Sequence, residues 1–287
     1  MMQAPVAKML PDGIRMHLQH GPIDLIIGAD GDRSAAFSAA TERFQTILEE
    51  LVAELPQLRG QQTGTLRGVV AQQMLQAVGP HRQSGFITPM AAVAGAVADT
   101  ILGAMVAGAD LRRAYVNNGG DIAVWLTGET QFHTLVSAPD QTELARINLT
   151  ADAPARGIAT SGLPGRSLSR GIADAVTVLA RTAAAADVAA TMIANAVDLA
   201  DCSAITRVPA CALDPDSDLG ERLVVTQVGD LSKNQVSHAL SQGALRAKNL
   251  CDQGVIFGAA LFLRRQSYVL GPIQTQQNQI RKSAEYA

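Results

Sequence analysis

The order of strand-like and helix-like segments constrains this chain more than any other feature. Two helices of small residues are expected at 88–107 and 182–200. Five strand-like stretches lie between them: 114–126, 131–138, 143–149, 156–160 and 173–180. Strands that follow one another without an intervening helix pair most simply as antiparallel neighbours, whereas a doubly wound sheet alternates strands with helices. The order therefore predicts an α+β fold, with a mostly antiparallel sheet and packed helices.

The segments outside this core fit the same class of fold. Alternating apolar residues predict a hairpin over 14–27, and apolar residues at helical spacing predict a helix over 34–55 that Pro56 ends. The remaining expected elements are a strand over 222–228, a helix over 231–251 and a hairpin over 255–270. Residues 57–85 show no clear pattern. The end of the chain, 271–287, is a polar tail, and its segment QTQQNQIRKSAEYA, 274–287, is expected to be loosely held. No linker-like stretch divides the chain, so a single unit over 1–287 is expected.

Composition narrows the classes of function. Of the 287 residues, 47% are hydrophobic and 17% charged, which is typical of a globular protein. The net charge of -3 and the 3% of aromatic residues argue against a nucleic-acid partner. Three cysteines without a CxxC pair favour a reducing compartment, and the N-terminus lacks an apolar signal region, so a cytoplasmic protein is expected. Asp99 interrupts the most apolar segment, 89–108, which favours a buried helix over a membrane span.

Standard catalytic motifs are missing, and glycine-rich turns remain as candidate sites. The stretch NNGGD, residues 117–121, has apolar strands on both sides. Asn-Gly is the strongest short hairpin signal, because both residues tolerate positive φ. Two glycines also let a backbone approach a ligand and present N–H groups to anionic oxygens. On these residues alone a turn is favoured over a ligand loop.

Two further stretches have the same ambiguity. Thr160-Ser161-Gly162 follows a short strand, and is either a hydroxyl-rich turn or a set of donors for a phosphate or a ring edge. The helix that opens at Thr88-Pro89 either packs closely through its small residues or points its N-terminus at a phosphate. Spacing does not decide between these alternatives.

A polar pair stands out in the second small-residue helix. Asp187 and Thr191 are four residues apart and share a helical face among alanines. A carboxylate and a hydroxyl are hard oxygen ligands of the kind that magnesium accepts, usually with water and substrate phosphate completing the shell. The alternative is a buried aspartate that accepts hydrogen bonds from its neighbours, and the pair alone favours that alternative.

Taken together and in order, these stretches resemble a known family. The core of the ApbE-type flavin transferases, once called thiamine-biosynthesis lipoproteins, is similar to ITPMAAVAGAVADTILGAMVAGADLRRAYVNNGGDIAVWL, ATSG and DAVTVLARTAAAADVAATMIANAV in this chain. The recognisable core spans about 87–197. An uncharacterised branch of the superfamily, uncharacterised protein family 0280, is similar throughout these stretches.

The resemblance implies an ApbE-like, T-fold-like α+β architecture and a set of site residues. It implies Asp187 and Thr191 as ligands of Mg²⁺. It implies a pocket for FAD, or for another flavin, nucleotide or pterin ligand, lined by the following residues: Asn118, Gly119, Gly120, Asp121, Thr160, Ser161 and Gly162. The chain departs from the transferases at two places. Ala94 stands where they have a lysine, and the segment before the strand at 173–180 lacks their His-Ile-x-Asp-Pro-x-Thr-Gly motif.

Two functions follow from the resemblance and its departures, and a third alternative is a structural or assembly protein that reuses the fold with its pocket filled by side chains. One is a magnesium-dependent transferase or cofactor-biosynthesis enzyme that acts on a flavin- or pterin-like compound. The other is a non-catalytic protein that binds or handles a cofactor, associated with methanopterin-linked one-carbon metabolism. In both cases the expected partner is a small molecule, with no nucleic acid and no membrane, and a homo-oligomer is compatible with the close packing of small-residue helices.

Overall fold

A computed structural model describes residues 4–61, 64–138, 140–165 and 167–275. The chain forms two compact units. The first comprises Met1–Phe132, Leu149–Ala159 and Ala180–Val188, and the second comprises His133–Asn148, Thr160–Leu179 and Ala189–Ala287. The sequence predicts that residues 1–287 fold as a single unit, and this stays a prediction.

An antiparallel sheet forms one layer of the first unit. Its strands are β1 (Val6–Met9), β2 (Arg15–His20), β3 (Ile23–Gly31), β4 (Leu111–Asn118), β5 (Asp121–Leu126) and the first three residues of β8 (Gly157–Ser161), in this spatial order. Each of these pairs runs antiparallel. The predicted hairpin over 14–27 is confirmed as β2 and β3, in which Leu18 pairs with Leu25 and both are fully buried.

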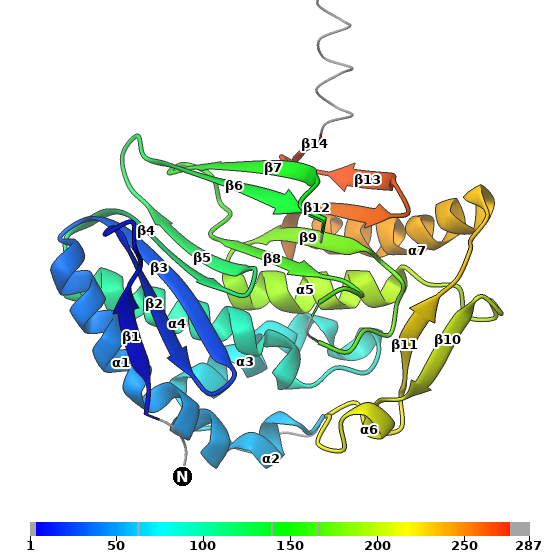
Figure 1. The fold of residues 1–287 in the computed structure, drawn as a ribbon, viewed down its shortest axis with the longest axis horizontal. Helices are drawn as coiled ribbons and strands as arrows, with labels where there is room; N and C mark the ends of the chain where they lie inside the picture. The colour runs from blue at the N-terminus through cyan, green and yellow to red at the C-terminus, as the bar shows by residue number, and fades with distance from the viewer. Residues whose placement is uncertain (1–3, 62–63, 139, 166, 276–287) are drawn as a thin grey trace, which may run out of the picture. The chain divides into compact units, whose positions relative to one another are not determined.

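Helices α1 (Arg33–Ala53) and α4 (Val93–Gly108) cover one face of this sheet (Figure 1). Helix α3 (Val69–Val78) packs against α1 and α4, and the remaining helical segments are α2 (Leu55–Leu58) and the 3-10 turns η1 (Gly79–Ser84) and η2 (Pro89–Ala92). The predicted helix over 34–55 is confirmed as α1. It ends just before Pro56, which stands in the first turn of α2, where a missing N–H costs nothing.

Helix α4 is the most apolar element of the first unit. Together with η2 it is the one helical segment among the described residues that is long and apolar enough to cross a membrane, by length and composition alone. Half of its most apolar window is buried, and α4 packs against α1, β4 and β5. This is the packing of a core helix, as expected from the sequence.

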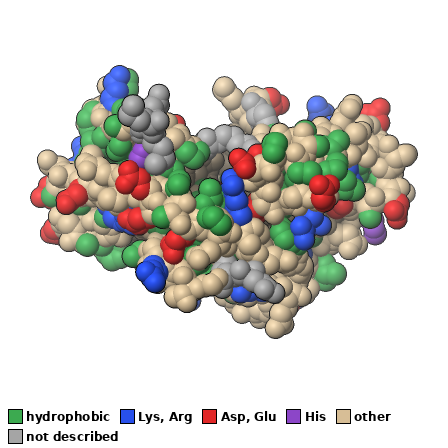
Figure 2. Space-filling model, turned by 90° about the horizontal axis from the view of Figure 1, so that it is seen from below, with side chains coloured by type: hydrophobic (Ala, Val, Ile, Leu, Met, Phe, Trp, Pro, Cys, Tyr) green, Lys and Arg blue, Asp and Glu red, His purple; other side chains and the backbone are tan. Residues whose placement is uncertain are grey.

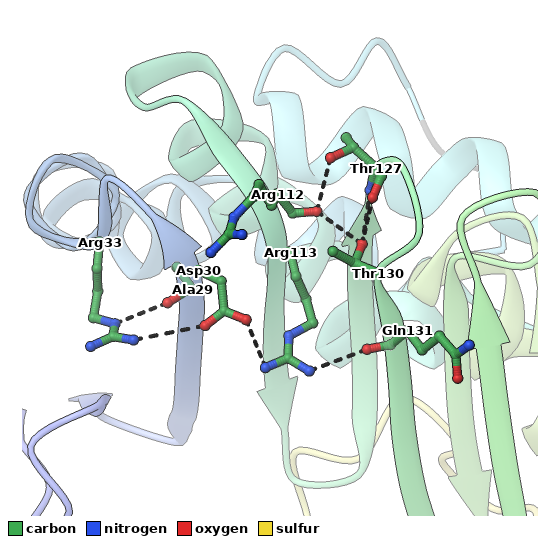
Figure 3. A network of polar contacts seen from close by, with 8 residues as sticks. All are labelled: Ala29, Asp30, Arg33, Arg112, Arg113, Thr127, Thr130 and Gln131. Carbon is green, nitrogen blue, oxygen red and sulfur yellow. Dashed lines mark hydrogen bonds and ion pairs between the residues drawn. The ribbon is translucent and has the colours of Figure 1, made fainter.

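A polar network secures one end of this sheet (Figure 3). Arg113 Nη2 lies 2.7 Å from Asp30 Oδ2, and Arg113 Nη1 donates to the carbonyl of Gln131 at 3.2 Å. The Arg112 carbonyl accepts the hydroxyl protons of Thr127 and Thr130, each at 3.1 Å. The Arg113 side chain and the Arg112 carbonyl therefore stabilise strand ends.

On the face seen in Figure 2, positive and negative side chains are interspersed.

The second unit is also mixed. Its strands are most of β6 (Gln131–Ser137) and β7 (Glu143–Thr150), the end of β8, β9 (Ala175–Ala180), β10 (Ile205–Pro209), β11 (Leu223–Val228), β12 (Ile256–Leu263), β13 (Gln266–Leu270) and β14 (Gln274–Thr275). Hydrogen-bonded neighbours among them follow the orders β8-β9-β12-β13, β10-β11 and β14-β7-β6. Its helices are the second half of α5 (Ala183–Ala196), α6 (Ala210–Leu213) and α7 (Lys233–Asp252). Ser232 and Gln235 form a capping box at the start of α7.

The α+β expectation is confirmed, because antiparallel strand pairs and packed helices make up the described residues. One expectation needs correction. The sequence predicts a loosely held tail from Gln274 onward, but Gln274 and Thr275 form β14, which pairs with β7, and Thr275 is 4% exposed. Residues 276–287 lie outside the described residues.

Candidate functional site

The NNGGD stretch forms a two-residue hairpin turn in the first unit. Asn118 ends β4 and pairs directly with Asp121, the first residue of β5. The two residues between them, Gly119 and Gly120, have φ values of 63° and 113°, which side chains rarely adopt. The side-chain oxygen of Asn117 also accepts the N–H of Gly120 at 2.8 Å. The turn alternative raised by the sequence is therefore correct as a description of the backbone.

Asn118 ties this turn to the start of α4. Its side chain is 6% exposed, and its Nδ2 donates to the carbonyl of Ala94 at 3.1 Å. A buried amide that is satisfied by a backbone group fixes the distance between turn and helix. The conformation of the Asn118–Asp121 turn is thus set relative to the first turn of α4.

The N-terminus of α4 receives a carboxylate from α5. Asp187 Oδ2 accepts the N–H of Gly95 at 3.0 Å, and the N–H of Ala94 contributes a second hydrogen bond. N–H groups at the start of a helix have no partner within the helix and favour negative charge. The sequence left open whether this helix end points at a phosphate, and in the structure it points at Asp187.

The opposite contact is made by Asp99, which lies on α4. Its Oδ1 accepts the N–H of Ala183 at 3.0 Å, and its Oδ2 accepts the N–H of Ala184 at 2.9 Å. Thr182 Oγ1 accepts the next N–H, that of Ala185, at 3.1 Å. Helices α4 and α5 therefore cap each other, each giving an aspartate to the other's first turn. We call Asp99, Asp187 and the backbone N–H groups they accept the reciprocal cap.

Close approach of the two helices makes the reciprocal cap possible. A Cβ placed on Gly95 would lie 2.3 Å from the carbonyl oxygen of Ala183, far inside normal contact distance. Glycine at this position lets the backbones meet, so that a short aspartate side chain reaches across in both directions. The small residues of both helices, which the sequence shows plainly, are used for this approach.

Both carboxylates of the reciprocal cap are partly buried, and both have raised pKa values. Burial raises the pKa of Asp99 from 3.8 to about 6, against the opposing effect of the hydrogen bonds from Ala184 and Ala183. Burial also raises the pKa of Asp187, and the negative charge of Asp99 raises it further. Neither carboxylate has a cationic side chain among the causes of its shift. Backbone N–H groups, rather than cationic side chains, are therefore the groups that stabilise the charged form of these carboxylates.

This chemistry fits a divalent cation at Asp187. A carboxylate that accepts two backbone N–H groups keeps lone pairs for a metal, and a cation beside it would favour its charged form. Within the described part of the chain, no group of three or more His, Cys, Asp or Glu side chains gathers around one point. A metal here would need hydroxyl, backbone, water or ligand oxygens as well, which is usual for Mg²⁺.

The other predicted residues belong to the second unit. Thr191 follows Asp187 by one helical turn along α5 and is partly buried. Thr160 is exposed, and its hydroxyl lies 2.9 Å from that of Thr177 on β9. Ser161 ends β8, and Gly162 packs so closely on Asp174 that an added Cβ would lie 2.7 Å from its carbonyl oxygen. Their part in a common pocket stays a prediction.

The sequence reasoning gave no role to Gly95 or Asp99. The signal for Asp99 was present, since a charged residue in the middle of an apolar helix needs a partner. That partner is a set of N–H groups 84 and 85 residues further along the chain, and no sequence pattern marks a backbone group.

Comparison with known proteins places the chain in a family. A family model described as "AbpE bacteria" matches residues 7–275. A UPF0280 protein of Methanopyrus kandleri is 35% identical over 208 residues, 70% of this chain and 82% of the relative. A UPF0280 protein of Methanothrix thermoacetophila is 40% identical over 120 residues, 41% of this chain and 49% of the relative, so this match spans about half of that relative's length.

A solved structure was also found. The ApbE protein of Thermotoga maritima is similar over 97% of this chain and 99% of its own, with 12% identity and a TM-score of 0.44. A similarity of this strength adds nothing to the assignment. On the family match and the relatives, the chain belongs to the ApbE-like family, in the uncharacterised branch of the UPF0280 proteins.

Proposed function

We propose that this protein binds Mg²⁺ at Asp187 and Thr191 and a flavin-, nucleotide- or pterin-like ligand beside the Asn118–Asp121 turn, as a cytoplasmic transferase or cofactor-biosynthesis enzyme. The observation that carries the proposal is the meeting of Asn118 and Asp187 at one helix end, through the carbonyl of Ala94 and the N–H of Gly95. Asn118 and Asp187, which are far apart in the sequence, thereby lie at the same end of α4 in the first unit.

Family membership supports the choice of ligand. The stretches that resemble the ApbE-type flavin transferases are the ones that supply Asn118 and Asp187. Thr160, Ser161 and Gly162 are proposed to line the same ligand's site, as the resemblance implies. A bound Mg²⁺ would neutralise phosphate charge on such a ligand. The protein's own part is to orient Asp187 through the α4 N-terminus and to hold the turn through Asn118.

The metal is tested first, with Mn²⁺ as a paramagnetic probe for Mg²⁺. The proposal expects the purified protein to bind Mn²⁺, and Mg²⁺ to compete for the same site. Asp187→Ala should abolish binding, because the charged ligand is lost, whereas Asp110→Asn should leave it unchanged. Asp110 is an exposed aspartate that follows α4 and serves as the matched control. Equal affinity in Asp187→Ala and the wild type would overturn the metal site.

The reaction is tested with FAD, Mg²⁺ and a protein or small-molecule hydroxyl acceptor. In a flavin transfer the flavin phosphoryl group forms a bond to the acceptor oxygen, the pyrophosphate bond breaks, and AMP leaves. Covalent flavin in the acceptor together with released AMP would support the transferase. Thermal stabilisation by FAD, or by a pterin, without any product would support a binding protein instead.

One observation favours that second function. The family's lysine position is Ala94, whose carbonyl accepts Asn118 and whose N–H donates to Asp187. No cation is supplied from this position to a phosphate, which weakens dinucleotide binding and transfer. A non-catalytic cofactor-binding protein, associated with methanopterin-linked one-carbon metabolism, is therefore the second candidate. Replacing Ala94 with lysine should raise affinity for FAD if the pocket is otherwise kept.

A further inference from the structure

The geometry assigns to Asp99 the role of a positioning residue, which fixes where Asp187 stands against α4 by holding the first turn of α5. Asp99 does not touch Asp187 through a hydrogen bond of its own. It acts through Ala183 and Ala184, whose N–H groups it accepts at 3.0 and 2.9 Å. Asp187 lies one turn further along the same helix. The inference rests on the proposed function only where it concerns metal binding.

The start of α5 depends on Asp99 for its orientation. Of the first three N–H groups of this helix, Thr182 satisfies that of Ala185, and Asp99 satisfies the other two. Two parallel hydrogen bonds accepted by one carboxylate fix direction as well as distance, as a bidentate pair does elsewhere. If they are lost, α5 keeps its local cap and the contact of Asp187 with α4, but its first turn is no longer held by α4.

Asp187 makes the contact in the opposite direction, from α5 to α4. Asp187 reaches the N–H of Gly95, which lies four residues before Asp99 on the same helix. The backbones are in contact there, so a small rotation of α5 either drives Ala183 into Gly95 or moves Asp187 away from it. Residues that orient a metal ligand typically affect metal affinity by 10- to 100-fold. Asp99 meets this description although it is not itself a ligand.

Two variants separate positioning from simple charge. Asp99→Asn removes both the charge and one of the two acceptors. Asp99→Glu keeps the charge and lengthens the side chain by one methylene group, which moves both acceptor oxygens relative to the N–H groups of Ala183 and Ala184. If Asp99 acted by charge alone, Asp99→Glu would bind Mn²⁺ as tightly as the wild type. A positioning role predicts that both variants lose affinity, Asp99→Asn by about tenfold or more and Asp99→Glu by several-fold.

A readout independent of metal is hydrogen exchange at individual amides. Asp99→Asn should speed exchange at Ala183 and Ala184 by about tenfold, the loss of one hydrogen bond. The decisive amide is that of Gly95, which contacts Asp187 and not Asp99. A positioning role predicts several-fold faster exchange at Gly95 in both variants, and the wild-type rate in Asp110→Asn.

The outcomes separate this inference from the proposed function. Wild-type exchange at Gly95 in both variants, with unchanged Mn²⁺ affinity, would overturn the role of Asp99. If the wild-type protein binds no Mn²⁺, the proposed metal site fails, and exchange at Gly95 still decides whether Asp99 positions Asp187. If Asp99→Asn does not fold, Asp99→Glu supplies both measurements.

Discussion

At the scale of single residues, Gly95 is a position where one added methyl group should lower stability. Gly95→Ala places a methyl group 2.3 Å from a backbone oxygen of α5, and backbone cannot yield as a flexible side chain does. We expect this variant to lose about 1–3 kcal/mol of unfolding free energy, the usual effect of overpacking. Urea denaturation monitored by circular dichroism measures it.

The same helix contains the control for this prediction. Gly103 is exposed, and a Cβ at that position would meet nothing within 4 Å. Alanine is the better helix former, so Gly103→Ala should raise the unfolding free energy by up to about 1 kcal/mol. Equal effects of the two substitutions would mean that contact between α4 and α5 does not constrain Gly95.

Asn118 and Asp187 were identified as candidate site residues from the sequence because their local motifs resemble the family's motifs. Asp99 was not, because its role depends on backbone groups that lie far along the chain. A side chain's type and neighbours are visible in a sequence, whereas its acceptor or donor on another element is not. The same limit left open whether the helix end points at a phosphate or at a carboxylate.

At the scale of elements, the β12–β13 hairpin is held in a costly conformation. Arg264 and Arg265 form its turn with φ values of 48° and 65°, and neither is glycine. The left-handed conformation costs an ordinary residue about 1–2 kcal/mol. Arg265→Gly should therefore raise unfolding free energy by up to about 1 kcal/mol, as measured by chemical denaturation.

Arg264 provides the comparison within the same turn. Its guanidinium Nη2 donates to the carbonyl of Val228 at 2.8 Å, a contact that glycine would lose. Arg264→Gly should therefore raise the unfolding free energy by less than Arg265→Gly does, or leave it unchanged. A lower unfolding free energy in Arg265→Gly would show that the Arg265 side chain makes an interaction whose stabilisation exceeds the cost of the left-handed backbone.

The reciprocal cap should make stability depend on pH. In the unfolded chain the pKa of Asp99 is near 3.8, and in the folded protein it is about 6, so the folded state holds this proton more tightly. Its stabilising contribution is complete below pH 3.8 and is lost as pH rises through 6. The raised pKa of Asp187 acts in the same direction.

Comparing Asp99→Asn with the wild type isolates this effect from other carboxylates. Between pH 4 and 7, without divalent ions, the wild type should lose unfolding free energy more steeply, by at most about 1.4 kcal/mol per pH unit for one group. Denaturation curves across this range measure the difference. Parallel pH profiles for the two proteins would contradict the raised pKa.

Most long elements were predictable from their periodicity, and the short or exposed ones were not. Strand β1 has all four residues exposed, so it shows no alternation of buried and exposed positions. The β10–β11 pair stands apart from the larger sheets, and only β11 was expected. Helix α3 lies in the segment that gave no pattern, although Val70 and Met74 are buried on one face. Tertiary packing decides such elements more than local pattern does.

At the scale of the whole molecule, the chain alternates between the two units. It leaves the first unit at Phe132, returns for Leu149–Ala159 and returns again for Ala180–Val188. The first unit needs both returns, because β8 pairs with β5 and α5 caps α4. We predict that residues 1–132 alone do not fold and that the full chain unfolds in one transition.

The single tryptophan makes this prediction measurable. Trp125 belongs to the first unit, so its fluorescence reports that unit, whereas far-ultraviolet circular dichroism reports the whole chain. The two transitions in urea should coincide. A second reporter, Tyr268→Trp in a Trp125→Phe background, follows the second unit. Distinct midpoints for the two fluorophores would show two separately folding units.

The alternation of the chain also has a consequence for synthesis on the ribosome. The N-terminal half emerges first, but the N–H groups of Ala94 and Gly95 have no partner until Asp187 has been made, and the last segment of the first unit ends at residue 188 of 287. Pairings over such sequence separations form slowly. The nascent chain therefore carries the first turn of α4 uncapped until Asp187 has been made, although α1, β4 and β5 are already available to pack against the rest of that helix.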